Sequence, residues 1–202
     1  MRVIVASNNP NKIREIKSIL SPIGWEVLSQ REAGVQVEPE ETGDTFEENS
    51  MIKARAVMEA SGMPAIADDS GLSVDALDGE PGVHSARYGG DSCPDDKARN
   101  ELLRRTMEPI PDEDRSARFV SVITMMWPDG KAISARGEIC GEILREEQGD
   151  GGFGYDPLFY ISAEGCTMAQ LTPERKNQIS HRANALKAFV EKLKKEKDDA
   201  DK

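Results

Sequence analysis

Two adjacent carboxylates, Asp68 and Asp69, directly follow the short apolar segment 64–67. If this segment is a strand, the two side chains point to opposite faces, so both can serve one site only where the strand ends. The dipeptide Ser70-Gly71 predicts such an end. Ligands of open α/β sheets bind at strand ends, where an acidic pair suits a divalent cation or the activation of a water. On these residues alone, a solvated turn is the favoured interpretation.

The composition limits the class of protein. Of 202 residues, 38% are hydrophobic and 31% are charged, which is typical of a globular protein with one sizeable core. No apolar stretch approaches the roughly 18 residues of a membrane span, so we expect no membrane association. We expect one domain with two lobes over residues 1–197. Residues 198–202 are predicted to form a charged, disordered tail.

Charge and cysteine usage exclude further classes. The net charge of -11 opposes binding to a nucleic-acid polymer, because such binding needs clustered cations that neutralise phosphates. A small phosphorylated ligand would need local lysines and a divalent cation. Cys93, Cys140 and Cys166 are widely spaced and form no Cys-x-x-Cys pair. The sequence thus predicts a cytoplasmic protein without a disulfide framework or structural zinc.

A polar loop near the N-terminus lies between a predicted strand over residues 2–7 and a predicted helix over residues 11–20. The loop reads Ser7-Asn8-Asn9-Pro10-Asn11-Lys12. The start of a helix directs backbone N–H groups and a positive dipole end toward an anion, and Lys12 adds a cation. The loop lacks the glycines of a Walker sequence. Taken alone, an ordinary strand-to-helix turn is somewhat favoured over phosphate binding.

An acidic loop over residues 38–44 precedes a second helix. Thr45 and Glu48 form a capping box, which predicts a helix that continues to about residue 61 and carries Lys53. The four carboxylates of the loop repel one another unless a cation lies near. The alternative is a solvated acidic surface, which is the more common meaning of this pattern.

The second half of the chain alternates strands, turns and helices. We expect a helix over residues 95–107 and a hairpin of strands over 118–127 and 131–136. A separate short strand is expected near 138–144, and a final helix over about 178–197. Between them, residues 149–160 combine glycines with aromatic rings. A planar ligand could stack there, and a flexible loop is the alternative.

Each of these sequence features is a weak signal alone, but together they describe the parts of one binding site. Lys12, Lys53, Lys176, His181 and Arg182 are candidate contacts for phosphate or base. The carboxylates Glu41, Asp68 and Asp69 can hold Mg²⁺, which prefers oxygen ligands together with a substrate phosphate. The glycine-aromatic loop would take a flat base. Together they predict a magnesium-bound nucleotide.

At this point the chain resembles a known family, the inosine triphosphate pyrophosphatase-like, noncanonical purine nucleoside triphosphate pyrophosphatases. The resemblance runs from Val3 to about Phe189. Six ordered blocks carry it: Ser7-Asn8-Asn9-Pro10-Asn11-Lys12, Glu41-Thr42-Gly43-x-Thr45-Phe46-x-Glu48-Asn49, Ala67-Asp68-Asp69-Ser70-Gly71-Leu72, Gly82-x-x-Ser85-Ala86-Arg87-Tyr88, Gly152-Phe153-Gly154-Tyr155-Asp156-Pro157 and Ser180-His181-Arg182.

The resemblance implies cleavage between the α and β phosphorus atoms of ITP, dITP or XTP, which gives a monophosphate and pyrophosphate. It implies Mg²⁺ held by Glu41 and Asp69, with Asp69 also activating the water and Asp68 in a supporting position. The implied substrate contacts are Ser7, Asn8, Asn9, Pro10, Asn11, Lys12, Lys53 and Ser70, and, around base and sugar, Phe153, Gly154, Tyr155, Asp156, Lys176, His181 and Arg182. It also suggests a homodimer.

The expected fold is α/β, with a twisted mixed central sheet, helices on its faces and an active-site cleft between two lobes. Two departures from the family pattern stand out. Pro10-Asn11 replaces the glycines of many relatives and stiffens the first loop. Glu40-Glu41 leaves a one-residue ambiguity in the metal ligand, and the family's spacing to Lys53 favours Glu41.

Two other functions stay open at this stage. One is a nucleotide sensor that binds without turnover, and the other is a related pyrophosphatase with a different nucleotide preference. For the leading function, a donor to the 6-oxo edge of hypoxanthine or xanthine would be unsatisfied against the amino group of adenine, which costs about 1–3 kcal/mol. Guanine also carries a 6-oxo group, so its rejection must come from the 2-position.

Overall fold

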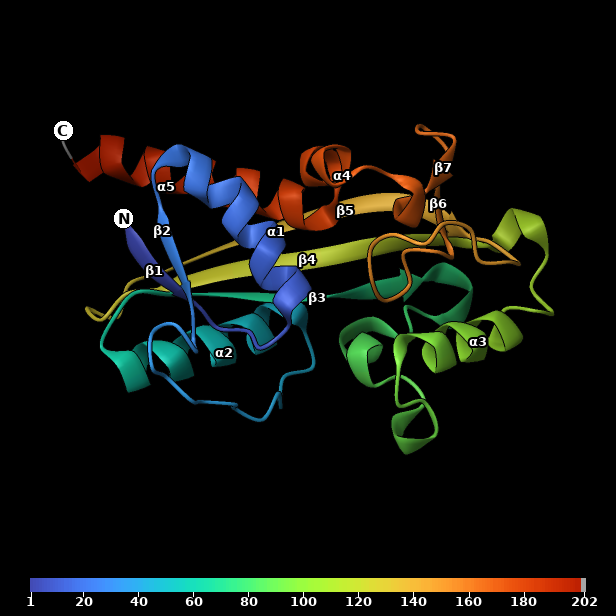
Figure 1. The fold of residues 1–202 in the computed structure, drawn as a ribbon, viewed down its shortest axis with the longest axis horizontal. Coiled ribbons are helices and arrows are strands. Elements are labelled where there is room, and N and C mark those ends of the chain that lie inside the picture. The colour runs from blue at the N-terminus through green and yellow to red at the C-terminus, as the bar shows by residue number, and fades with distance from the viewer. Residues whose placement is uncertain (201–202) are drawn as a thin grey trace. The chain divides into compact units, whose positions relative to one another are not determined.

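The computed structural model describes residues 1–200, and within them a single mixed sheet has the strand order β2-β1-β3-β4-β5-β6-β7 (Figure 1). β1 pairs in parallel with β2 and β3, whereas β6 pairs antiparallel with β5 and β7. The predicted α/β class with a mixed sheet is confirmed. The strands are β1 Arg2–Val5, β2 Glu26–Ser29, β3 Ala65–Val74, β4 Ser116–Met126, β5 Ala132–Ile143, β6 Phe159–Ile161 and β7 Cys166–Thr167.

Helices α1, α2 and α3 lie in connections between strands, and α4 and α5 follow the last strand. The α-helices are α1 Pro10–Leu20, α2 Phe46–Ser61, α3 Asp96–Thr106, α4 Pro173–Ile179 and α5 His181–Ala200. Short 3-10 helices cover Ser21–Ile23, Asp75–Leu77, Gly82–Arg87, Gly90–Ser92, Asp112–Asp114 and Met168–Gln170. None of the helices in the described range is long and apolar enough to cross a membrane.

The chain divides into two compact units. Unit 1 contains Met1–Ser70, Ser121–Gly137 and the chain from Ser180 onward, and unit 2 contains Gly71–Val120 and Glu138–Ile179. Strands β3, β4 and β5 each contribute residues to both units. The cleft expected between two lobes stays a prediction.

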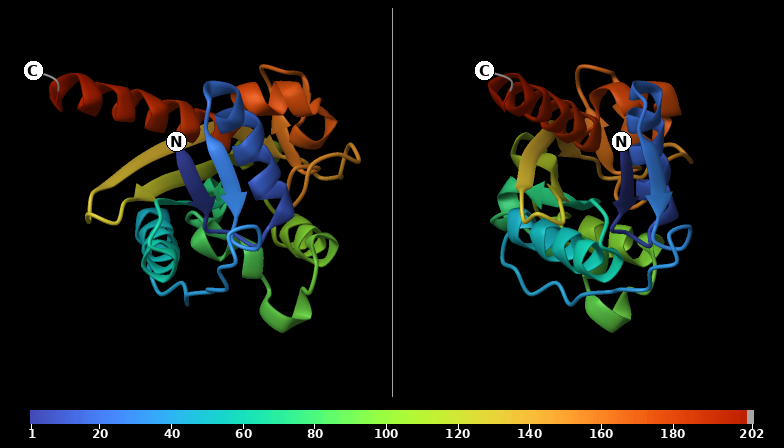
Figure 2. Two further views of the ribbon diagram at one scale, coloured as in Figure 1. Left: turned by 60° about the vertical axis from the view of Figure 1, so that its left-hand side comes forward. Right: turned by 90° about the vertical axis from the view of Figure 1, so that its left-hand side faces the viewer.

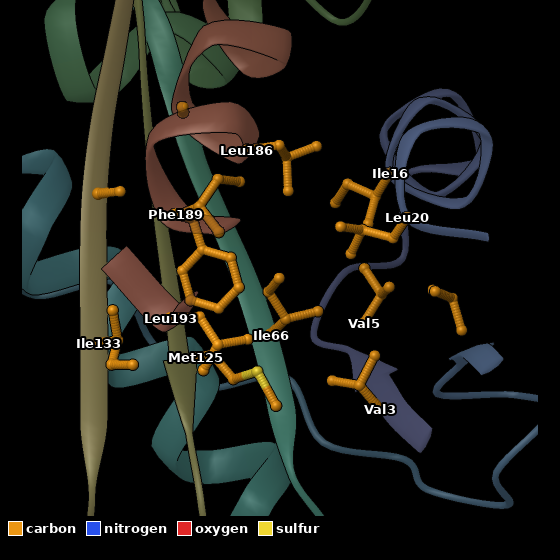
Figure 3. Packing of buried hydrophobic residues seen from close by; sticks show 14 residues of the cluster. Val3, Val5, Ile16, Leu20, Ile66, Met125, Ile133, Leu186, Phe189 and Leu193 are labelled. Atoms are coloured by element: carbon orange, nitrogen blue, oxygen red, sulfur yellow. The ribbon is translucent and has the colours of Figure 1, made fainter. Parts of the chain in front are cut away.

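Unit 1 is layered, because alternate residues of β1 face opposite sides of the sheet. Val3 and Val5 belong to a core built with α1 and α5, which Figure 3 shows through Ile16, Leu20, Leu186, Phe189 and Leu193. Ile4 and Ala6 belong to a second core that includes residues of α2, namely Ala54, Val57 and Met58. Figure 2 shows α1 and α5 on one side of the strands and α2 on the other.

Unit 2 has its own apolar core. Leu103 and Met107 of α3 pack with Leu72 and Val74 from the second half of β3, and with Phe159 of β6. The ring of Phe159 lies 4.5 Å from that of Phe119, measured between centroids. Tyr155, which belongs to the predicted glycine-aromatic loop, is part of this core.

Several boundaries differ from the sequence-based prediction. β3 does not stop at Ser70-Gly71 but continues to Val74, because Leu72 and Val74 are fully buried in the core of unit 2. The two short strands expected over 131–144 form the single strand β5. The final helix begins at His181, after a separate helix α4. The predicted tail is helical as far as Ala200, and residues 201–202 lie outside the described residues.

Gly137 of β5 permits a close approach by the first turn of α5. A Cβ at this position would lie 2.1 Å from the backbone nitrogen of Ala185 and 2.5 Å from the carbonyl oxygen of His181. Real Cβ atoms do not come so close to backbone atoms, so an alanine would displace this turn. The glycine therefore determines where the start of α5 lies in unit 1.

We predict that Gly137→Ala lowers the free energy of unfolding by about 1–3 kcal/mol, because the added methyl group overpacks a rigid contact. Urea unfolding measures the change. Ala132→Ser is the matched control: it lies on the same strand at an exposed position, and its effect should stay below about 0.5 kcal/mol. Equal effects of the two substitutions would contradict the steric argument.

Candidate functional site

The loop between β1 and α1 is an ordered helix start. Asn9 is the N-cap, and its side-chain oxygen accepts hydrogen bonds from the backbone nitrogens of Asn11 (2.9 Å) and Lys12 (3.3 Å). Pro10 occupies the first helical position, where its missing N–H is not needed. Ser7 accepts a bond from the backbone nitrogen of Asn9 at 3.1 Å. The loop is thus held by its own side chains at the positive end of α1.

Asn8 lies apart from these bonds. It is exposed and lines a cavity of about 450 Å³ together with residues of the segment that follows β2: Arg31, Gly34, Val35, Gln36, Val37 and Glu38. The candidate carboxylates are not among the residues that line this cavity. It therefore borders the predicted phosphate loop rather than the acidic pair.

Asp68 is almost fully buried and faces two cations. Its Oδ2 atom lies 2.9 Å from Lys12 Nζ and 3.0 Å from Arg182 Nη2, and the hydroxyl of Ser121 donates to Oδ1 at 2.6 Å. Burial alone would raise the pKa of Asp68, but the charges of Arg182 and Lys12 outweigh it and hold the pKa well below its ordinary value. Burial lowers the pKa of Lys12, which Asp68 offsets only in part.

Asp69 belongs to a separate network with the α2 helix. Lys53 Nζ lies 2.6 Å from Asp69 Oδ1 and 2.9 Å from Glu41 Oε1, and it also donates to the backbone oxygen of Asp68 at 3.0 Å. Burial lowers the pKa of Lys53, but the two carboxylates outweigh it and raise the pKa overall. Burial raises the pKa of Asp69, and the attraction of Lys53 counters this only partly.

The oxygen atoms near Lys53 fit a divalent cation of the magnesium type. Asp69 Oδ2 is buried and has no hydrogen-bond partner among the described residues. Glu41 shares Lys53 with Asp69 and supplies a second carboxylate. Residues 1–200 contain no group of three or more His, Cys, Asp or Glu side chains that could hold a metal. A cation here would therefore need further oxygens from water or phosphate, which is how magnesium is usually bound.

Arg182 is as deeply buried as Asp68, with 1% of its surface exposed. Its Nη2 atom donates to Asp68 Oδ2 and, at 2.9 Å, to the hydroxyl of Ser70, while Nη1 pairs with Glu15. Asp68 and Glu15 raise the pKa of Arg182 although burial opposes this. The family resemblance predicts that Arg182 lies near the base and sugar. The structure places its guanidinium beside Asp68.

Glu15 is a site residue that the sequence motifs do not reveal. It lies three residues after Lys12 on α1, so both side chains project from the same face of the helix. That spacing was the available signal, but a single glutamate on an amphipathic helix gives no sign that its partner is a buried arginine. His181 is the first residue of α5 and directly precedes Arg182 in the sequence. Its side chain is also buried.

Unit 2 holds the predicted glycine-aromatic loop. Asp156 Oδ2 accepts bonds from Lys176 Nζ at 2.6 Å and from the backbone nitrogen of Phe153 at 2.9 Å. Lys176 Nζ also lies 4.6 Å from the centroid of the Phe153 ring. Gly152 is required at its position, because its φ is +75° and a Cβ would lie 2.1 Å from Asp156 Oδ2.

The two aromatic rings of this loop have different environments. Phe153 is partly exposed, whereas Tyr155 is buried and donates its hydroxyl hydrogen to the backbone oxygen of Ser85 at 2.9 Å. Burial raises the pKa of Tyr155 above its ordinary value. Phe153 is consequently the ring of the two that a planar ligand could contact.

The structure thus brings the predicted residues together within each unit. In unit 1, one network contains Lys12, Glu15, Asp68, Ser70 and Arg182, and the other contains Glu41, Lys53 and Asp69. In unit 2, Lys176 contacts both Asp156 and Phe153. Each network combines cations and carboxylates that the sequence analysis assigned to different ligands: Lys12 and Arg182 pair with Asp68, and Lys53 pairs with Glu41 and Asp69.

Comparison with known proteins identifies the family. A model described as the Ham1 family matches residues 3–192, and the chain belongs to this family. A dITP/XTP pyrophosphatase of Thermus thermophilus is 47% identical over 194 residues, which are 96% of this chain and 92% of the relative. A protein with the same name from Haemophilus influenzae is also 47% identical, over 95% of this chain and 98% of the relative. The resemblance predicted from the six sequence blocks is confirmed.

Solved structures agree with the fold. The Ham1 protein of Staphylococcus aureus has a TM-score of 0.85 and 43% identity, with 97% of this chain and 100% of that chain covered. A HAM1 protein of Coxiella burnetii has a TM-score of 0.86 and 40% identity, with coverage of 96% and 99%.

We predict that Asp68→Asn lowers the free energy of unfolding by about 3–5 kcal/mol, because it leaves the charges of Lys12 and Arg182 buried and poorly compensated. Urea unfolding at pH 7 measures this. Asp75→Asn is the control, since it removes an aspartate that pairs with Arg118 at the surface and should cost below about 1 kcal/mol. If both variants lose the same free energy, the buried network does not stabilise unit 1 as argued.

Proposed function

We propose that this protein hydrolyses noncanonical purine nucleoside triphosphates, namely dITP, ITP and XTP, to the monophosphate and pyrophosphate. The observation that carries the proposal is the buried, unpartnered Oδ2 of Asp69 beside the Glu41–Lys53 pair, in a chain of the Ham1 family. The names of its relatives, dITP/XTP pyrophosphatase, supply the substrate class.

In the proposed reaction a water attacks the α-phosphorus. A new oxygen–phosphorus bond forms, the bond between the α-phosphorus and the bridging oxygen breaks, and pyrophosphate leaves. Asp69 accepts the proton of the attacking water, and its raised pKa brings this carboxylate closer to the range of an effective general base. Lys53 stays protonated because Asp69 and Glu41 raise its pKa, so it can hold a phosphate oxygen.

Mg²⁺ is the proposed cofactor, with Glu41 and Asp69 as its ligands. When bound, it would neutralise phosphate charge and polarise the phosphorus under attack. The Lys53 contact supports Glu41 over Glu40, because Glu41 pairs with Lys53 whereas Glu40 is exposed. Asp68 has a supporting role: it neutralises Lys12 and Arg182 from the opposite face of β3.

The remaining proposed substrate contacts form two groups, one for the triphosphate and one for the base and sugar. For the triphosphate we propose Ser7, Asn8, Asn9, Pro10, Asn11, Lys12, Lys53 and Ser70. For base and sugar we propose Phe153, Gly154, Asp156, Lys176 and His181, whereas the buried Tyr155 would support the loop from the core and Arg182 would hold Asp68 in place. The contact of Lys176 with both Asp156 and the Phe153 ring supports a base-binding role. Homodimerisation, a cytoplasmic location and the absence of a nucleic-acid partner stay predictions.

The direct test is incubation of the protein with dITP and magnesium, followed by chromatographic identification of the products. We expect dIMP and pyrophosphate in equal amounts, no turnover after chelation by EDTA, and recovery when magnesium is added back. Initial rates for dATP and dGTP should be lower than for dITP. Release of orthophosphate would contradict the proposed bond cleavage, and equal rates across the panel would contradict the substrate class.

The acidic residues Asp69, Glu41 and Glu40 should differ in their effects on turnover and on metal binding. Asp69→Asn should lower kcat by about 10²–10⁴-fold, because the amide cannot accept the proton of water. Glu41→Gln should raise the magnesium concentration needed for half-maximal rate, whereas Glu40→Gln, one residue away and exposed, should leave it unchanged. A wild-type protein that binds dITP without hydrolysis would instead indicate a nucleotide sensor.

A further inference from the structure

Two side chains near the start of α3 hydrogen-bond to the backbone of Gly154 in the glycine-aromatic loop. The backbone nitrogen of Gly154 donates to Asp96 Oδ2 at 2.7 Å, and the backbone oxygen of Gly154 accepts from Asn100 Nδ2 at 3.1 Å. Asp96 and Asn100 are four residues apart and therefore project from the same face of α3. Both polar groups of Gly154 are thus bound by one helix of unit 2.

Packing alone does not explain an asparagine at position 100. The residue is 3% exposed, and its Oδ1 atom has no hydrogen-bond partner in the part of the chain that the structure describes. A buried amide that leaves a polar atom unsatisfied is costly, and an apolar residue would avoid this cost. What Asn100 supplies in return is the hydrogen bond to Gly154.

Gly154 is a position at which the loop needs such a restraint. Its φ is +63°, and the space where a Cβ would stand is open. A glycine in these surroundings can move to other backbone conformations, because no side chain limits it. Its neighbours are held otherwise: Phe153 donates to Asp156, and Tyr155 donates to Ser85. We call the two hydrogen bonds from Asp96 and Asn100 to Gly154 the clamp. The clamp restricts the backbone of Gly154, which lies between the two aromatic residues.

We infer that Asp96 and Asn100 are positioning residues that hold the Phe153–Asp156 loop in the geometry needed to select the base. The inference rests on the proposed function. Since both polar groups of the Gly154 backbone are bound to α3, its neighbour Phe153 and the Lys176–Asp156 pair are left to contact the base. A small displacement of the ring or of these charged groups would weaken the discrimination between bases, because such recognition depends on positions held by surrounding bonds.

The test compares kcat and KM for dITP and dATP at saturating magnesium in the wild type, Asn100→Ala and Asp96→Ala. We expect KM for dITP to rise about tenfold and kcat to change by less than about threefold, because the phosphate and metal residues are untouched. The ratio of kcat/KM for dITP to that for dATP should fall by a similar factor. Asp96→Asn keeps an acceptor oxygen for Gly154 and should recover most of this ratio.

Two control variants lie on the same helix turn. Lys97→Ala changes an exposed residue and should leave the ratio unchanged. Asp95→Ala removes the N-cap bond to the backbone nitrogen of Ala98, which weakens the start of α3 without removing either bond to Gly154. Its thermal unfolding temperature should therefore fall while the dITP to dATP ratio stays within about twofold of the wild type.

Hydrogen exchange of residues 149–158 provides a readout independent of turnover. Exchange should accelerate in Asn100→Ala and Asp96→Ala but not in Lys97→Ala, because only the first two release Gly154. An unchanged dITP to dATP ratio in both clamp variants, with unfolding temperatures lowered as in Asp95→Ala, would overturn the inference and leave a purely structural bond. A wild type without dITP turnover but with the expected exchange pattern would overturn the proposed function and the selective role, while showing that the clamp itself exists.

Discussion

The buried guanidinium of Arg182 is the interaction on which the organisation of unit 1 depends. It joins Glu15 of α1 to Asp68 of β3, and it is carried by the first turn of α5. An arginine without these carboxylates would be too costly to bury, and each carboxylate would be costly without the arginine. The close contact of α5 with Gly137 places this turn against the sheet. Three elements distant in sequence are therefore coupled through one charge.

The alternation of side chains along β3 separates two tasks. Asp68 points toward Lys12 and Arg182 and has its pKa held low, which keeps it an anion that neutralises cations. Asp69 points toward Lys53 and retains an unpartnered oxygen and a raised pKa. Neighbouring residues of the same chemical type thus differ in charge partners, and that difference supports a structural role for one and a chemical role for the other.

In unit 2, too, some residues fix the loop while another is left available to a ligand. Asp156 binds the Phe153 backbone and Lys176, while Tyr155 is buried in the core and bonded to Ser85. Phe153 is left partly exposed on a loop whose backbone is bonded on several sides. A loop restrained in this way suits a role in discrimination, because selection between similar bases requires groups that do not adapt to the wrong one.

Local patterns and the order of residues are enough to predict the α/β class, the capping box at Thr45, the ordered motifs and the family. Sequence reasoning did not find that β3 continues past Ser70-Gly71, that Glu15 meets Arg182, or that Asp96 and Asn100 bind Gly154. These features depend on contacts between segments that are distant in the sequence, so they become visible in the folded chain. From the local pattern, a polar residue on a helix is predicted to be exposed to solvent. Its partner comes from a distant segment of the folded chain, and burial with that partner then determines its charge and its role.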